Sequence, residues 1–140
     1  MGAILLISGK DLDPDFLILG WDLRPATIHR KGEPFRKTKP EGEKRNTSTI
    51  IYDISNAEYS DLPAQIKETT AFLKDNKHYL EKLEMDKTID SIAIDFSYNS
   101  RIDGLKIEVQ HDSFPAQFIR IAGHLNIELR LTQWAYDSTE

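Results

Sequence analysis

Carboxylates, histidines and basic side chains are the groups in this sequence that could do chemistry, and their spacing matches no catalytic motif. The four histidines are His29, His78, His111 and His124, and none pairs with another at the helical spacing of a zinc site. The sequence has no G-x-S-x-G, G-x-x-x-x-G-K-[ST] or G-x-G-x-x-G segment. These absences predict a protein that is not an enzyme and that uses no metal and no cofactor.

Asp11, Asp13 and Asp15 have the alternation of a calcium-binding loop. An EF-hand loop also needs Gly at its sixth position and Glu at its twelfth, and this chain has other residues at both. Asp followed by Pro14 is instead typical of a helix start, because the carboxylate caps an unpaired backbone N–H and Pro has no N–H to leave unpaired. We therefore expect a capped, short helix that ends before Pro25.

Composition sets limits on the class of protein. A chain of 140 residues with 39% hydrophobic and 29% charged residues is expected to form one domain, residues 1–140, with a real core. The absence of cysteine excludes disulfides and thiolate chemistry and suits a reducing cytoplasm. The net charge of −5 argues against nucleic-acid binding, which needs a basic face. The N-terminal apolar run is too short for a signal peptide or a membrane span, so no membrane is expected.

Hydrophobic periodicity predicts an α+β fold with a mainly antiparallel sheet and three helices in the order βαββαββαβ. The run 3–8 is apolar throughout and indicates a strand buried on both faces, and residues 88–98 alternate strictly, as a strand with one buried face does. Residues 105–109 alternate too and are expected to form a hairpin with 88–98. The last six elements have the βαββαβ order of ferredoxin-like domains. The expected strands are 3–8, 28–30, 49–54, 88–98, 105–109 and 126–131, and the expected helices start at 13, 61 and 113.

Two polar regions could bind a partner. The outward side chains of the predicted hairpin, among them Asp95 and Glu108, would form a flat polar surface if helices cover only the other face of the sheet. Residues 33–46 form a long loop, expected to be mobile, that carries Arg36 and Lys37 in the one basic segment of an acidic chain. This loop is either a solvated hairpin tip or a contact surface. Residues 132–140 are expected to be a polar tail.

Residues 9–14 read G-x-D-x-D-P, residues 25–27 read P-x-T, and Lys31-Gly32 follow a predicted strand. With this pattern the chain resembles a bacterial domain-of-unknown-function family of small α+β proteins. That family has a strand ending in G-x-D-x-D-P, a short helix, P-x-T, a strand ending in K-G, and a last helix and strand of alternating apolar residues. The matching residues are Gly9, Asp11, Asp13, Pro14, Pro25, Thr27, Lys31 and Gly32, with Phe118, Ile121, Gly123, Ile127, Leu129 and Leu131 near the end. These motifs are structural and carry no agreed activity.

Some members of that family resemble immunity proteins of bacterial polymorphic toxins, which implies a protein that neutralises a cognate toxin, possibly a basic nuclease, by direct binding. Acidic side chains would pair with the basic residues of such a toxin. The candidate contact residues are Asp90, Asp95, Glu108, Glu128, Arg36 and Lys37. The alternative is a small-ligand or regulatory domain, with anion-binding candidates Thr27, His29, Arg30 and Lys31. Exposed strand edges leave both a monomer and a homodimer open.

Overall fold

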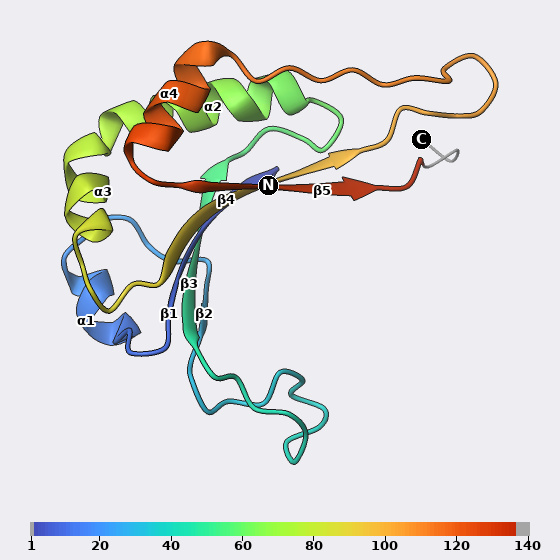
Figure 1. Ribbon diagram of the computed structural model, residues 1–140. Coiled ribbons are helices and arrows are strands. Elements are labelled where there is room, and N and C mark those ends of the chain that lie inside the picture. Colours follow the sequence, from blue (N-terminus) through green and yellow to red (C-terminus); the bar gives the residue numbers. More distant parts are fainter. Residues whose placement is uncertain (1, 137–140) are drawn as a thin grey trace.

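The computed structural model describes residues 2–136, which form five strands and four helices around one sheet (Figure 1). The elements in chain order are β1 (Ala3–Gly9), α1 (Pro14–Leu19), β2 (Thr27–His29), β3 (Ser48–Ser55), α2 (Leu62–Asp75), α3 (Lys77–Glu84), β4 (Ser91–Asn99), α4 (Ala116–His124) and β5 (Glu128–Trp134). Within these residues no helix has both the length and the apolar character that crossing a bilayer requires.

The sheet has the strand order β2-β3-β1-β4-β5, and β1 is its central strand. β1 is antiparallel to both of its neighbours, so β3 and β4 run parallel to each other with β1 between them. β5 is the one strand that pairs in parallel, with β4, and α4 makes the connection between them. The four helices lie on one face of the sheet (Figure 1). The predicted α+β class with a mainly antiparallel sheet is therefore confirmed.

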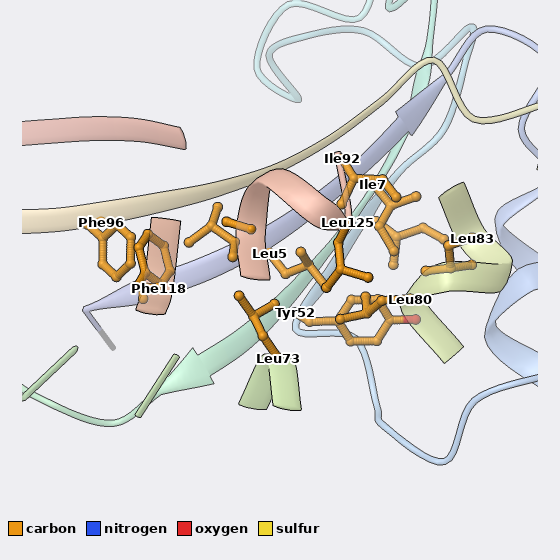
Figure 2. Packing of buried hydrophobic residues seen from close by; sticks show 14 of the residues in the cluster. Leu5, Ile7, Tyr52, Leu73, Leu80, Leu83, Ile92, Phe96, Phe118 and Leu125 are labelled. Carbon is orange, nitrogen blue, oxygen red and sulfur yellow. The ribbon is translucent and has the colours of Figure 1, made fainter. Parts of the chain in front are cut away.

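The core lies between the sheet and the helix layer, where side chains from β1, β3 and β4 meet those of α2, α3 and α4. Leu5 and Ile7 of β1 are fully buried near Leu73 and Leu80 of the helices (Figure 2). At the other end of the core, the rings of Phe96 and Phe118 have centroids 5.6 Å apart in an edge-to-face arrangement. This packing fixes which face of each strand is covered and which is not.

Two helix starts follow the sequence signals, at Asp13 and Asp61. The predicted start of the last helix at residue 113 is wrong, because α4 begins at Ala116 with Pro115, which offers no capping side chain, at its N-cap. The Asp13 carboxylate accepts hydrogen bonds from the backbone N–H groups of Asp15 and Phe16, at 3.1 and 3.4 Å, and Pro14 is the first helical residue. Asp61 caps α2 in the same way by accepting from the N–H of Ala64 at 3.0 Å. The interpretation of the aspartates near the start as capping residues is thus confirmed for Asp13.

The predicted count of three helices is wrong, because the helix that starts after Asp61 divides at Asn76 into α2 and α3. The Asn76 side chain uses its amide to donate to the Phe72 carbonyl at 2.9 Å and its oxygen to accept from Trp21 Nε1 at 3.2 Å. A short side chain that bonds to the preceding turn competes with continued helix. The structure therefore has four helices rather than three.

The predicted strand 105–109 is also wrong: these residues are irregular. β4 has β1 on one side and β5 on the other, so neither edge of β4 is free for a hairpin partner. Instead the Asp103 carboxylate accepts from the N–H groups of Leu105, Lys106 and Ile107 at 2.8 to 2.9 Å and closes a tight turn. The observed order is βαββααβαβ, and the predicted ferredoxin-like βαββαβ unit is absent.

The last helix ends later than the sequence indicates. The sequence favours a helix end at Gly123, because glycine is the usual residue after a helix, but Gly123 lies inside α4 and Asn126 instead takes the left-handed conformation with φ 56°. The N–H of Ile127 donates to the Ala122 carbonyl at 2.9 Å, as in a Schellman motif. β5 then runs to Trp134, so residues 132–134 belong to the sheet and not to the polar tail predicted for residues 132–140. Residues 137–140 of that predicted tail lie outside the described residues.

Candidate protein-binding face

The face of the sheet opposite the helices is uncovered by any helix of the described residues (Figure 1). Strand alternation places on it the residues between the buried ones, which we call the open face. The open face includes Ile4, Leu6, Ser8, Thr49, Ile51, Asp53, Ala93, Asp95, Ser97, Glu128, Arg130 and Thr132, of which Ala93 is only 1% exposed. The prediction that the first strand is buried on both sides is wrong, because Ile4 and Leu6 are half-buried while their neighbours are fully buried.

Register across the sheet gives the open face an apolar centre. Leu6 lies opposite Ile51 of β3 on one side and Ala93 of β4 on the other. Directly opposite side chains in a sheet have Cβ atoms about 4.5–5.5 Å apart, so these three form one contiguous row. No helix of the described residues covers this row, and Glu128 of β5 continues it opposite Ala93. Ala93 itself is only 1% exposed, so a flat partner surface could contact Ile51 and Leu6.

A charged row lies beside this apolar row. Ile4 has Asp53 opposite it on β3 and Asp95 opposite it on β4, and Asp95 in turn lies opposite Arg130 of β5. The two aspartates lie on strands separated by one strand, so their backbones are about 10 Å apart. The open face therefore presents two carboxylates on either side of an isoleucine, an arrangement suited to basic side chains of a protein.

Asp95 is the candidate residue that the structure places most clearly on the open face. Its carboxylate lies 2.8 and 3.0 Å from Thr132 Oγ1, and the single hydroxyl proton can serve one of these contacts at a time. Arg130, its register neighbour, donates instead to Glu128 at 3.1 Å. Asp95 thus keeps acceptor capacity for an incoming donor, and Glu128 lies on the same face at the edge of the sheet.

Asp90 belongs to a different place, at the end of the sheet beneath α3. Its carboxylate accepts from the Lys10 N–H at 2.8 Å, and its own N–H donates to the Ser8 carbonyl at 2.8 Å. These bonds hold the end of β1, a structural role that its type alone did not indicate. Asp90, Glu84 and Glu128 also line a shallow cleft of about 150 Å³.

Glu108 does not join the open face. It lies in the irregular segment 100–113, which is closed on itself by an ion pair between Arg101 and Asp112 at 2.9 Å and by the bond from the Arg101 N–H to Gln110 Oε1 at 2.7 Å. The predicted surface that joins Asp95 and Glu108 is therefore wrong for Glu108, while Asp95 does lie on the open face. The segment carries exposed apolar side chains, of which Leu105 is 86% exposed.

Arg36 and Lys37 lie on an arm, residues 30–47, that projects past the end of the sheet from β2 and β3, at the opposite edge from β5 (Figure 1). The arm has its own hydrogen bonds, including Gly32 N–H to the Arg45 carbonyl at 2.8 Å, and the Arg45 guanidinium lies 4.9 Å from the centre of the Phe35 ring. The structure therefore does not bring Arg36 and Lys37 together with Asp95.

The anion-binding candidates are largely occupied by their neighbours. Arg30 pairs with Asp15 at 2.8 Å, and the Lys31 ammonium donates to the Lys10 carbonyl at 3.3 Å. Burial, reinforced by the charge of Arg45, lowers the pKa of His29, which disfavours a charged imidazolium there. Among residues 2–136 no three metal-ligating side chains come close enough to hold an ion.

A cleft of about 500 Å³ lies elsewhere, between α2 and the start of α4. Its walls are mainly apolar and include Ile66 and Pro115, and Lys67 and Lys74 also line the cleft. No residue singled out from the sequence lines this cleft. Sequence reasoning also missed Asp53, although the alternation of 49–54 already sets Asp53 on the face opposite Ile50 and Tyr52.

The fold and the open face together define a single-sheet α+β domain with a helix layer on one side and a partly apolar, partly acidic sheet surface on the other. A family model described as a domain of unknown function (DUF4279) matches residues 1–136, and the chain belongs to that family. The expected membership of a family without assigned function is thereby confirmed. No curated protein and no solved structure matches the chain.

Proposed function

We propose that this chain is a non-enzymatic, cytoplasmic protein-binding domain whose contact surface is the open face of the sheet, and that it acts as an immunity protein for a toxin. The observation that carries the proposal is the pair of half-buried apolar residues Ile51 and Leu6, which no helix of the described residues covers, with Asp53 and Asp95 beside them. An apolar centre with charged groups around it is the usual build of a protein interface.

The mechanism follows from these groups. A nuclease toxin carries lysine and arginine side chains that bind phosphate, and carboxylates at Asp53, Asp95 and Glu128 would pair with them. Such charge complementarity speeds association and excludes partners with the wrong charge. The apolar row would then be buried at the centre of the contact, where water is excluded and most of the binding free energy arises.

A toxicity assay tests this function. The toxin candidate is the protein captured from source cells by the tagged chain, and its expression in a test host should stop growth. Co-expression of the wild-type chain should restore growth, and the double variant Asp53→Lys with Asp95→Lys should fail to do so. The control for each substitution is Asp22→Lys, the same change of residue at an exposed position next to the partly buried ring of Trp21, and it is compared with Asp53→Lys and Asp95→Lys taken singly.

Growth restored equally by the open-face variant would overturn the placement of the contact on that face. A captured protein that is harmless to the host would leave protein binding intact and refute the immunity role. Titration calorimetry with the purified proteins measures the binding of each variant directly. Circular dichroism of each variant shows whether it is folded, so that a loss of binding is not mistaken for a loss of structure.

The second candidate, a small-ligand domain, rests on the cleft between α2 and α4. Its mainly apolar walls with Lys67 and Lys74 would suit an amphipathic anion. A thermal-shift screen of short fatty acids and aromatic carboxylates tests it, with Lys67→Ala and Lys74→Ala as variants. Shifts that persist in both variants, or no shifts at all, would count against it.

A further inference from the structure

β5 is a long, unpaired edge of the sheet. Of the two edge strands, β2 has 3 residues and β5 has 7. A long edge presents free backbone donors and acceptors, and natural proteins usually shorten it, charge it or cover it. Among residues 2–136 nothing pairs with the outer side of β5, so the backbone groups on this edge are free to bond to another strand.

The backbone of β5 has its free groups at defined residues. The Ser100 N–H donates to the Trp134 carbonyl at 2.8 Å, so the polar groups of Trp134 point toward β4. Successive residues of a strand point their N–H and C=O groups to opposite sides. The groups of Leu129, Leu131 and Gln133 therefore point to the free edge, where a second strand could bond to them.

The side chains of β5 are apolar on the helix side of the sheet. Leu129 and Leu131 lie in register with the buried residues Ile94 and Phe96 of β4, yet they are 40% and 51% exposed. They extend the core to the edge of the sheet without a cover. An occupant of this edge must therefore supply both a strand and apolar side chains on the same face.

A second β5 meets both requirements. When two copies are antiparallel about a two-fold axis at Leu129, each Glu128 lies opposite Arg130 of the second copy. Leu131 then lies opposite Ile127 of the second copy, which precedes β5 and keeps its N–H bond to the Ala122 carbonyl, so the strand pairing centres on residues 128–130. The intrachain pair of Arg130 with Glu128, at 3.1 Å, shows that both charges already lie on one face. Each of the two cross-strand pairs then joins a negative and a positive side chain, and opposite charges that face each other across two strands stabilise a sheet.

Other registers lose this match. A shift by one residue puts Arg130 opposite Arg130 of the second copy, which is repulsive. A further shift puts Arg130 opposite Thr132 and leaves Glu128 without a basic partner. Charge complementarity thus selects the register centred on Leu129, and the two-fold axis, perpendicular to the sheet, leaves both helix layers on the same side.

We propose that two copies of this chain pair through β5 in this register, giving a continuous ten-stranded sheet. The contact is isologous, as in most homodimers, because one strand supplies both halves. This inference goes beyond the proposed function: it uses the edge of the sheet with the charges of Glu128 and Arg130, while the rest of the open face, including Asp53 and Asp95, remains available on both copies.

Charge exchange tests the register. Sedimentation velocity of the purified chain should give a dimer, and Glu128→Arg alone or Arg130→Glu alone should give monomers because like charges then face each other. The doubly exchanged variant should dimerise again. An equimolar mixture of the two single variants should form a heterodimer, since one copy then carries two positive residues and the other two negative ones. Repair of the intrachain pair cannot produce this last result.

A wild-type monomer, single variants that stay dimeric, or a mixture that stays monomeric would each overturn the proposal. Thermal unfolding of the single variants, monitored by circular dichroism, checks that each remains folded. The measurement uses the isolated chain without any toxin, so its failure leaves the proposed immunity function standing, and failure of that function leaves the dimer standing.

A disulfide gives an independent test in a chain that has no cysteine. In the proposed register Leu129 faces itself in a hydrogen-bonded pair, where Cα atoms lie about 5.5 Å apart, within the roughly 4.4–6.8 Å range of disulfides. Leu129→Cys should therefore form a covalent dimer on mild oxidation. Gln133→Cys is the control, because residue 133 does not face itself. Efficient crosslinking at residue 133 and none at residue 129 would refute the register.

Discussion

Trp21 joins the connection between α1 and β2 to the point where α2 ends and α3 begins, and its removal should destabilise the fold markedly. Its ring is 4.5 Å from that of Tyr79 in a stacked arrangement, 4.8 Å from that of Tyr52 and 5.9 Å from that of Phe72, all between centroids. Its Nε1–H donates to Asn76 Oδ1 at 3.2 Å. One side chain thus ties three elements together.

The expected loss for Trp21→Ala follows from these contacts. Aromatic pairs contribute about 0.5–1.5 kcal/mol each beyond their burial, and a hydrogen bond contributes about 1 kcal/mol. Because Trp21 is half-buried, we expect ~3 kcal/mol, at the low end of the range for large-to-small core changes. Trp21→Phe keeps the ring contacts and loses the hydrogen bond, so it should cost ~1 kcal/mol.

Urea denaturation followed by circular dichroism measures both variants. The same Trp→Phe change at Trp134, which is 52% exposed, is the matched control and should change stability by less than ~0.5 kcal/mol. A double-mutant cycle of Trp21→Phe with Asn76→Ala should give a coupling free energy of ~1 kcal/mol. The reasoning is refuted if Trp21→Ala costs no more than Trp21→Phe, or if the cycle shows no coupling.

Three further predictions concern single groups. The hydroxyl of fully buried Tyr52 has no hydrogen-bond partner among the described residues, so Tyr52→Phe should raise the free energy of unfolding in urea by ~1 kcal/mol. Burial, with a smaller effect of Tyr79, raises the pKa of Tyr52 from 10.0 to about 12. The stabilisation that comes from this shift should be complete below pH 10.0 and be lost as pH rises through about 12. The free energy of unfolding of Tyr52→Phe should not show this loss at alkaline pH. Asn126→Gly should be neutral or stabilising in thermal melts, whereas Asn126→Ala should cost ~1 kcal/mol because of the left-handed φ of 56°. Backbone N–H donors, first those of Ile107 and Leu105, lower the pKa of the Asp103 carboxyl from 3.8. The contribution of Asp103 to folding stability should therefore be present above pH 3.8 and be lost as pH falls through the lowered pKa. An NMR titration of this carboxyl with a midpoint at or above 3.8 would contradict the prediction.

Local signals predicted the starts of α1 and α2 correctly, placed the start of α4 too early, and failed where neighbouring strands decide the outcome. The N-caps at Asp13 and Asp61 depend on residues within one turn, and both form. The alternation of residues 105–109 is as regular as that of β4, yet it yields no strand, because β1 and β5 occupy both sides of β4. Periodicity gives a segment's preference and does not tell whether an edge is free to accept it.

The candidate site was predictable in part for the same reason. Alternation alone placed Asp95 on an outward face, and the structure keeps it there. Its neighbours Asp53 and Arg130 come from strands 42 and 35 positions away in the numbering, and only the register of the sheet brings them beside it. Asp90 was selected by its charge, but its hydrogen bond to the Lys10 N–H, invisible in the sequence, makes it a support for β1.

The central position of β1 has a consequence for how the chain reaches this fold. The first strand in sequence can pair only with partners that begin at Ser48 and Ser91, so most of its hydrogen bonds close loops of many tens of residues. Folding speed falls as contacts become less local. On the ribosome, β1 must wait with apolar side chains such as Leu5 and Ile7 unprotected until β4 has emerged. A nascent chain stopped before residue 91 should therefore remain protease-sensitive and bind chaperones, and protection should appear in one late step.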